Sequence, residues 1–157
     1  MKTAAIATSL RYEAIPDEVA WEARETLRDA FGHVLSIVTT EAPCRSCLRV
    51  SREPEPMILF SYRPLDDTGP YAEVGPIFIH AGACRRYRDG ATFPPDFLDR
   101  RLVLRAYDRA GAIFDATVAE PGLAPAVASA FLTDDRVAQV HVRHASYTCY
   151  DFRIVRA

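Results

Sequence analysis

Four residues that bind soft metal ions stand in two close pairs, Cys44-x-x-Cys47 and His80-x-x-x-Cys84. They include three of the chain's four cysteines and one of its four histidines. Zinc prefers four sulfur and nitrogen donors around a tetrahedron, and proteins commonly supply them as short-range pairs. The spacing therefore predicts a zinc site made by Cys44, Cys47, His80 and Cys84. Because four protein ligands leave no position for water, we expect a structural rather than a catalytic ion.

Two other interpretations of the same residues stay open. The cysteines could be buried thiols without metal, since free cysteine behaves as a small hydrophobic residue, and His80 could be a core histidine. A site with only three protein ligands would leave a coordination position for water and so permit a catalytic metal ion. Cys149 is a candidate to replace one of the four ligands. A thioredoxin-like role for Cys44 and Cys47 is disfavoured, because the segment 48–53 is too short before Pro54 to supply the activating helix.

The last two predicted strands, 137–143 and 149–155, suggest a thiol-dependent enzyme as the alternative function. Both alternate apolar and polar residues, which predicts one buried and one solvated face. Pairing Arg143 with Cys149 would set His141 opposite Asp151, and Cys149 would lie diagonally from the imidazole. Cys149, His141 and Asp151 are therefore candidate catalytic residues, with Cys44 as a second candidate nucleophile. The plainer interpretation is a row of polar pairs that solvates the sheet face.

A further group of residues could bind a small anionic ligand. Tyr71 and Glu73 precede a sharp turn before the strand that ends at His80, and Arg45 is a candidate to share that region. Arginine and tyrosine side chains together suit an anionic molecule. The alternative is that Arg45, Tyr71 and Glu73 are ordinary surface and turn residues.

Length and composition predict one soluble domain spanning residues 1–157. The chain has 157 residues, 49% of them hydrophobic and 25% charged, which is ordinary for a globular domain. A net charge of −2 gives no footprint for nucleic acid or a membrane surface. The N-terminus is too weakly apolar for a signal peptide. We therefore expect a cytoplasmic protein whose thiols stay reduced.

Hydrophobic periodicity predicts an α+β fold with a mostly antiparallel, curved sheet of about seven or eight strands and two main helices. The first residues, to Leu10, are expected to form a short edge strand. A helix is predicted from Pro16 to Phe31, with Gly32 as its terminator, and a second at 123–132. The remaining strands are predicted at 34–40, 57–62, 76–80, 102–107 and 112–118. Exposed strand edges could pair in a homodimer.

Several sequence blocks resemble a bacterial family known only as domain-of-unknown-function family DUF1203. The blocks are Pro43-Cys44-Arg45-x-Cys47-Leu48, the run from Pro70 to Ala81, Leu104-Arg105-Ala106-Tyr107-Asp108, and the closing stretch from His141 to Arg153. The resemblance implies a stand-alone bacterial cytoplasmic domain and assigns no activity, substrate or catalytic residue. Together with the predicted zinc site, it favours an uncharacterised binding or accessory module.

Overall fold

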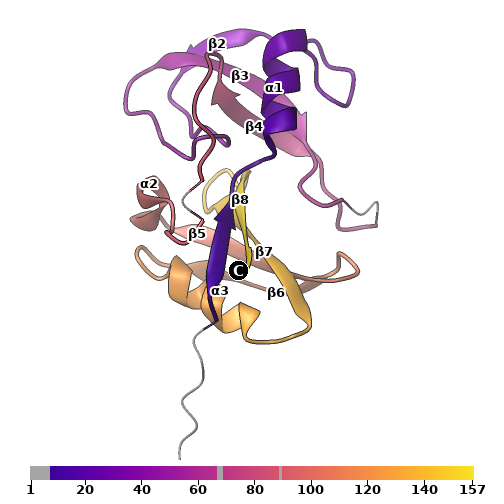
Figure 1. The fold of residues 1–157 in the computed structure, drawn as a ribbon, viewed down its shortest axis with the longest axis vertical. Coiled ribbons are helices and arrows are strands. Elements are labelled where there is room, and N and C mark those ends of the chain that lie inside the picture. Colours follow the sequence, from indigo (N-terminus) through magenta and orange to yellow (C-terminus); the bar gives the residue numbers. More distant parts are fainter. Residues whose placement is uncertain (1–7, 67–68, 89) are drawn as a thin grey trace, which may run out of the picture.

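The computed structural model describes residues 8–66, 69–88 and 90–157. In these residues the chain forms eight strands and three helices, in two layers that Figure 1 shows one above the other. The elements in chain order are β1 (Leu10–Glu13), α1 (Asp17–Thr26), β2 (Ile37–Thr40), β3 (Glu55–Tyr62), β4 (Gly75–His80), α2 (Pro95–Leu98), β5 (Leu102–Asp108), β6 (Ile113–Ala119), α3 (Ala124–Leu132), β7 (Val137–His144) and β8 (Tyr150–Arg156).

The strands divide into two antiparallel sheets rather than one curved sheet. A five-stranded sheet has the order β1-β8-β7-β5-β6, and a three-stranded sheet has the order β2-β3-β4. The predicted number of strands and the antiparallel pairing are confirmed, but the prediction of a single sheet is wrong. Apolar alternation identifies a strand without saying which sheet it joins, so the division could not be read from the sequence.

Each sheet has its own hydrophobic core. Helix α3 packs against the larger sheet, where Leu104, Val140 and Phe152 are fully buried. Helix α1 covers the smaller sheet, and Ala20 and Ala23 face its apolar strands. The cysteines Cys44 and Cys47 belong to this second core. The predicted metal ligands therefore lie at the base of the smaller layer, where it meets the larger one.

Helix α1 ends five residues earlier than the periodicity predicted. Leu27 adopts a left-handed conformation with φ of 48°, and its N–H donates to the carbonyl of Ala23 at 3.1 Å. The chain then turns back, and the N–H of Leu35 donates to the carbonyl of Leu27 at 2.8 Å. Gly32 has φ of 83° within this returning loop rather than at the helix end. The 3.6-residue periodicity of apolar residues could not predict that the chain leaves the helix after Thr26 and turns back.

The N-terminal strand prediction is tested only in part. Residues 1–7 lie outside the described residues, and β1 begins at Leu10, where the expected strand was to end. Strand β1 pairs with β8 at the edge of the larger sheet, with Leu10 opposite Arg156. Among the described residues, no helix is long and apolar enough to cross a membrane.

Candidate metal centre

The segment between β2 and β3 folds into a tight knuckle that presents two thiols. The N–H of Cys44 donates to the carbonyl of Arg49 at 3.0 Å, and the N–H of Leu48 donates back to the carbonyl of Cys44 at 2.8 Å. Leu48 takes a left-handed φ of 56°, which reverses the chain directly after Cys47. This closed turn holds both cysteine side chains on the same side of the backbone.

Strand β4 brings the histidine to the knuckle. The N–H of Arg45 donates to the carbonyl of Phe78 at 3.0 Å, so the knuckle lies along the edge of β4. The N–H of His80 points at the Cys44 sulfur, 3.3 Å away. Cys84 follows in irregular chain and not in a helix, because the next helix, α2, starts only at Pro95. From this irregular segment Cys84 still reaches the other three residues.

The four ligand atoms are close enough to share one ion. One donor atom from each of Cys44, Cys47, His80 and Cys84 lies within 4.8 Å of all the others. The Cys44 and Cys84 sulfurs are 3.7 Å apart, and the Cys47 sulfur is 3.5 Å from Nδ1 of His80. Tetrahedral bonds of about 2.3 Å to sulfur and about 2.0 Å to nitrogen require edges of roughly 3.8 and 3.5 Å. The sequence-predicted ligands thus form a cluster that can hold a metal ion.

Two further residues support the ligands and were missed in the sequence. Nε2 of His80 lies 2.7 Å from a carboxylate oxygen of Glu55, so its Nδ1 is left to face the cysteines. Arg24, on α1, donates to the Cys84 sulfur at 3.2 Å and to the carbonyl of His80 at 3.0 Å. A carboxylate behind a metal-binding histidine fixes the ring orientation and raises its basicity. Neither residue could be found from spacing, because both reach the site from other elements.

The charges of the cluster favour a bound cation. Hydrogen bonds from Cys44 and Cys47 lower the pKa of Cys84. The pKa of Cys47 is raised, because its thiol is hydrogen-bonded to Cys44 and Cys84 and is buried. The thiols therefore share their protons when no ion balances them, since three adjacent thiolates repel one another. A divalent cation would allow all three to ionise. One positive charge on Arg24 then matches the net charge of −1 that three thiolates and Zn²⁺ leave.

The candidate catalytic residues are arranged differently from the predicted register. His141 lies opposite Arg153, and Arg143 lies opposite Tyr150. The observed pairing is two residues away from the predicted one. The turn closes where the N–H of His144 donates to the carbonyl of Cys149, which shifts the pairing by one residue, and a bulge in β8 at Asp151 shifts it by one more. The predicted pairing of His141 with Asp151 is therefore wrong.

Part of the polar face of this hairpin is also buried rather than solvated. His141 and Asp151 have no exposed surface, and Arg143 is 7% exposed. His141 packs between the rings of Tyr107 and Tyr150, with centroid distances of 4.5 and 5.1 Å. Burial lowers the pKa of His141 to about 3, helped by Arg143 and Arg153. Its imidazole is neutral at pH 7, and aromatic rings surround it.

Asp151 instead forms a buried ion pair with the metal knuckle. One carboxylate oxygen lies 3.2 Å from Nη2 of Arg45, and the other lies 2.7 Å from Nδ1 of His144. Arg45 also donates from Nε to the carbonyl of Tyr150 at 2.8 Å. Arg45 stands between Cys44 and Cys47 in the sequence. Its side chain therefore joins the knuckle of the smaller layer to the β7–β8 hairpin of the larger one.

The three residues expected to bind an anionic ligand do not share one set of contacts. Arg45 is 3% exposed and bonded as described above, whereas Tyr71 is 45% exposed. Glu73 forms ion pairs with Arg105 at 2.8 Å and with Arg143 at 3.4 Å. Glu73 and Arg143 line a pocket of about 170 Å³ together with Cys149, whose side chain is half-buried. The small anionic ligand remains a prediction.

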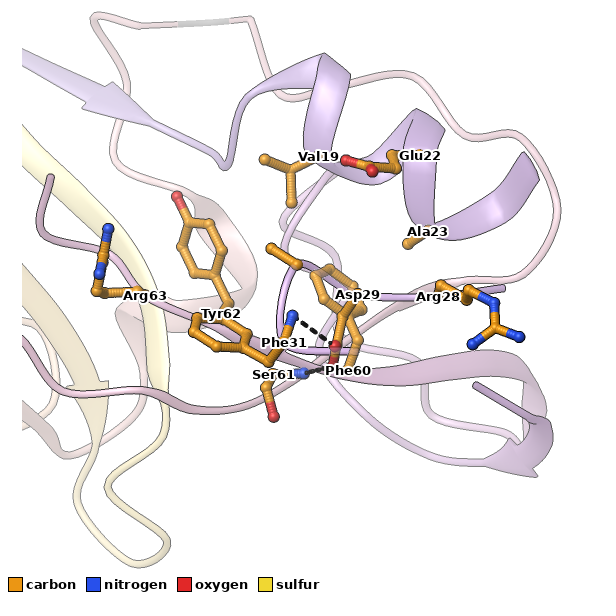
Figure 2. Close-up of a pocket in the computed structure, with 11 residues that line it drawn as sticks. Val19, Glu22, Ala23, Arg28, Asp29, Phe31, Phe60, Ser61, Tyr62 and Arg63 are labelled. Atoms are coloured by element: carbon orange, nitrogen blue, oxygen red, sulfur yellow. Dashed lines mark hydrogen bonds between the residues drawn. The ribbon is translucent and has the colours of Figure 1, made fainter. Parts of the chain in front are cut away.

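A separate pocket of about 340 Å³ lies between α1 and β3, as Figure 2 shows. Its polar centre is Asp29, whose carboxylate accepts hydrogen bonds from the N–H groups of Phe31, His33 and Ser61 at 2.9 to 3.0 Å. The dashed lines in Figure 2 mark the bonds from Phe31 and Ser61. With these donors and His33 Nδ1 at 2.8 Å, the carboxylate is fully engaged in holding the loop after α1. We assign it a structural role.

Comparison with known proteins places the chain in a family. The model of the family described as "Protein of unknown function (DUF1203)" matches residues 41–156, so the chain belongs to this family. All four clustered ligands lie inside the matched region, whereas Arg24 lies outside it. The search of curated proteins and the search of solved structures each found no significant match. The resemblance seen in the sequence is confirmed, and it brings no activity with it.

Proposed function

We propose that this protein is a binding or accessory module whose fold is stabilised by one structural zinc ion. The observation that carries the proposal is the set of four ligand atoms within 4.8 Å of one another, with edges of 3.7 and 3.5 Å that suit a tetrahedron. Sulfur-rich donor sets of this kind favour zinc over hard cations.

The position of the site supports a structural role for the ion. Cys44 and Cys47 are buried, and the knuckle that carries them lies on the edge of β4. The proposed ion would cross-link residues from three segments: the knuckle, the end of β4 and the irregular chain after it. Four protein ligands would complete its coordination and leave no place for a reactive water. Metal binding would then contribute directly to the free energy of folding.

The test is metal analysis of freshly purified protein. We expect about one zinc ion per chain, and we expect a strong chelator to lower the melting temperature by several degrees. Cys47→Ser should lose the zinc, whereas the matched control Cys149→Ser should keep it, because Cys149 lies outside the cluster. Protein without zinc that also fails to bind added zinc would contradict the proposal.

A small thiol-dependent enzyme remains the alternative hypothesis. Its nucleophile would be Cys149, which lines the pocket beside Arg143, or Cys44. This hypothesis requires one thiol that is alkylated rapidly below neutral pH, since the thiolate is the reactive species. Uniformly slow alkylation of the metal-loaded protein would exclude it. The single domain, the cytoplasmic location, the homodimer and the absence of nucleic-acid and membrane partners stay predictions.

A further inference from the structure

The four clustered ligands differ in how far solvent can reach them. Cys44 has no exposed surface and Cys47 is 9% exposed, whereas Cys84 is only partly buried. Cys84 also lies in irregular chain, without the backbone hydrogen bonds that fix the knuckle. Of the three clustered cysteines, Cys84 is therefore the one with the most exposed surface.

The sulfur of Cys84 lies in contact with the sulfur of Cys44. Their sulfurs are 3.7 Å apart, which is van der Waals contact, while the sulfur of Cys47 faces the imidazole of His80 at 3.5 Å. A disulfide between Cys44 and Cys84 would need the sulfurs to close to about 2.05 Å. The backbone of Cys44 is fixed by hydrogen bonds with Arg49 and Leu48, so we assign the movement to Cys84, whose segment after β4 belongs to no strand or helix.

We propose that Cys84 is a site of oxidation by hydroperoxides, and that its oxidation forms a disulfide with Cys44 and expels the metal. The inference rests on the proposed zinc site and assigns its regulation. The oxidant in this proposal is a peroxide. A peroxide is small and uncharged, so it can reach the sulfur of a partly buried cysteine.

The chemistry balances in two steps. The thiolate of Cys84 attacks the peroxide, so that an S–O bond forms, the O–O bond breaks, and hydroxide leaves and is protonated to water. The thiolate of Cys44 then attacks the sulfenic sulfur of Cys84. The S–S bond forms, the S–O bond breaks, and a second water is produced. Two thiolates are oxidised by two electrons, hydrogen peroxide is reduced to two water molecules, and the ion loses two of its four ligands.

Arg24 is placed to restrain this reaction. Its guanidinium donates to the Cys84 sulfur at 3.2 Å and is anchored by a second bond to the carbonyl of His80. A hydrogen bond to a thiolate withdraws electron density from the sulfur and lowers its nucleophilicity. Arg24→Met keeps much of the side-chain length but removes the bond. Arg28→Met is the matched control, because Arg28 lines the pocket beside Asp29 and, among the described residues, bonds to none of the four clustered side chains.

The experiment uses full-length, zinc-loaded protein in a Cys149→Ser background, which removes the thiol outside the cluster. Zinc content is measured first, so that an empty protein counts against the metal site and not against the oxidation. Hydrogen peroxide is then added, zinc release is followed with a chromophoric indicator, and the disulfide is located by peptide mass spectrometry.

We expect one zinc ion to be released per Cys44–Cys84 disulfide formed, and we expect Arg24→Met to release it several-fold faster than Arg28→Met. Retention of zinc after oxidation of Cys84 would overturn the inference. A disulfide between Cys44 and Cys47 as the first product, or equal rates for the two arginine variants, would also overturn it.

Discussion

At the scale of single residues, the candidate ligand His80 depends on a partner that the sequence did not reveal. Its Nε2 lies 2.7 Å from Glu55, and this hydrogen bond lowers the pKa of the Glu55 carboxyl. The carboxylate is therefore ionised at neutral pH and oriented toward the ring. Removing such a partner typically weakens metal binding by about 10- to 100-fold.

Glu55→Ala should lower the zinc affinity by about 10-fold, at the small end of that range, because the Glu55 side chain is 45% exposed. Glu55→Gln should fall between this variant and the natural protein, since an amide oxygen still accepts the bond. Competition with a chromophoric chelator measures the affinity. Glu53→Ala is the control from the same exposed stretch, and an equal effect in both variants would refute the orienting role.

His141 should make the fold sensitive to moderate acid. Burial and three nearby arginines lower its pKa from 6.5 to about 3, so the folded protein resists a proton that the unfolded chain accepts. This stabilising contribution is complete above pH 6.5 and falls as the pH drops toward 3, by about 2 kcal/mol at pH 5. His141→Phe keeps a ring beside Tyr107 and Tyr150 and cannot be protonated.

Urea unfolding at pH 7 and pH 5 tests this expectation. The natural protein should lose about 2 kcal/mol more than His141→Phe between the two pH values. Protonation of the metal ligands affects both proteins equally and cancels in the comparison. Parallel losses would show that His141 does not carry the effect.

At the scale of elements, the loop after α1 is built around one carboxylate. Burial by itself would raise the pKa of Asp29, but hydrogen bonds from Ser61, His33 and Phe31 outweigh it and hold the value at about 2. The bond to Ser61 crosses from the loop to β3 at 3.0 Å. Asp29 therefore closes the loop upon itself and attaches it to the smaller sheet.

Asp29→Asn should lower the free energy of unfolding at pH 7 by about 2 kcal/mol, given a shift from 3.8 to about 2. Because the folded pKa is lowered, the contribution of Asp29 is present above about pH 4 and disappears as the pH falls through 2. The difference between variant and natural protein should therefore shrink in acid. Denaturant titrations at several pH values measure it, with the exposed Asp135→Asn as control. A deficit that is independent of pH would contradict the assignment.

At the scale of the whole molecule, the two layers meet through a charge pair buried beside the metal cluster. The side chain of Arg45 is 3% exposed, and that of Asp151 has no exposed surface. Removing one partner of such a pair leaves an uncompensated buried charge, which costs about 3–5 kcal/mol. Removing both can cost much less than the sum of the single changes.

Asp151→Asn should therefore lower the free energy of unfolding by about 3 kcal/mol, and Arg45→Met should cost a similar amount. The double variant should be more stable than additivity predicts by about 2 kcal/mol. Urea unfolding of the zinc-loaded variants gives this coupling energy. Additive losses would mean that the pair does not join the two layers.

The sequence by itself determined which four residues cluster and most of the elements. Cys44, Cys47, His80 and Cys84 were identified by donor type and spacing, because zinc chemistry restricts both. Strands and the helix at α3 followed from periodicity, since a half-buried element must repeat its apolar residues at its own pitch. Ligand spacing and hydrophobic periodicity are properties of local chain geometry, and local geometry depends on residues that are close together in the sequence.

The tertiary structure alone decided how these pieces meet. The closure of the turn at His144 and Cys149 and the bulge at Asp151 each shift the register of β7 and β8 by one residue, so His141 does not face Asp151, whose carboxylate pairs with Arg45 instead. Part of the polar face of this hairpin is buried because the smaller layer covers it. The alternation of residues within β7 and β8 cannot predict that a second layer packs on this face. Arg24 and Glu55 reach the cluster from α1 and β3. Contacts between distant segments depend on packing, so they are fixed only when the whole chain has folded.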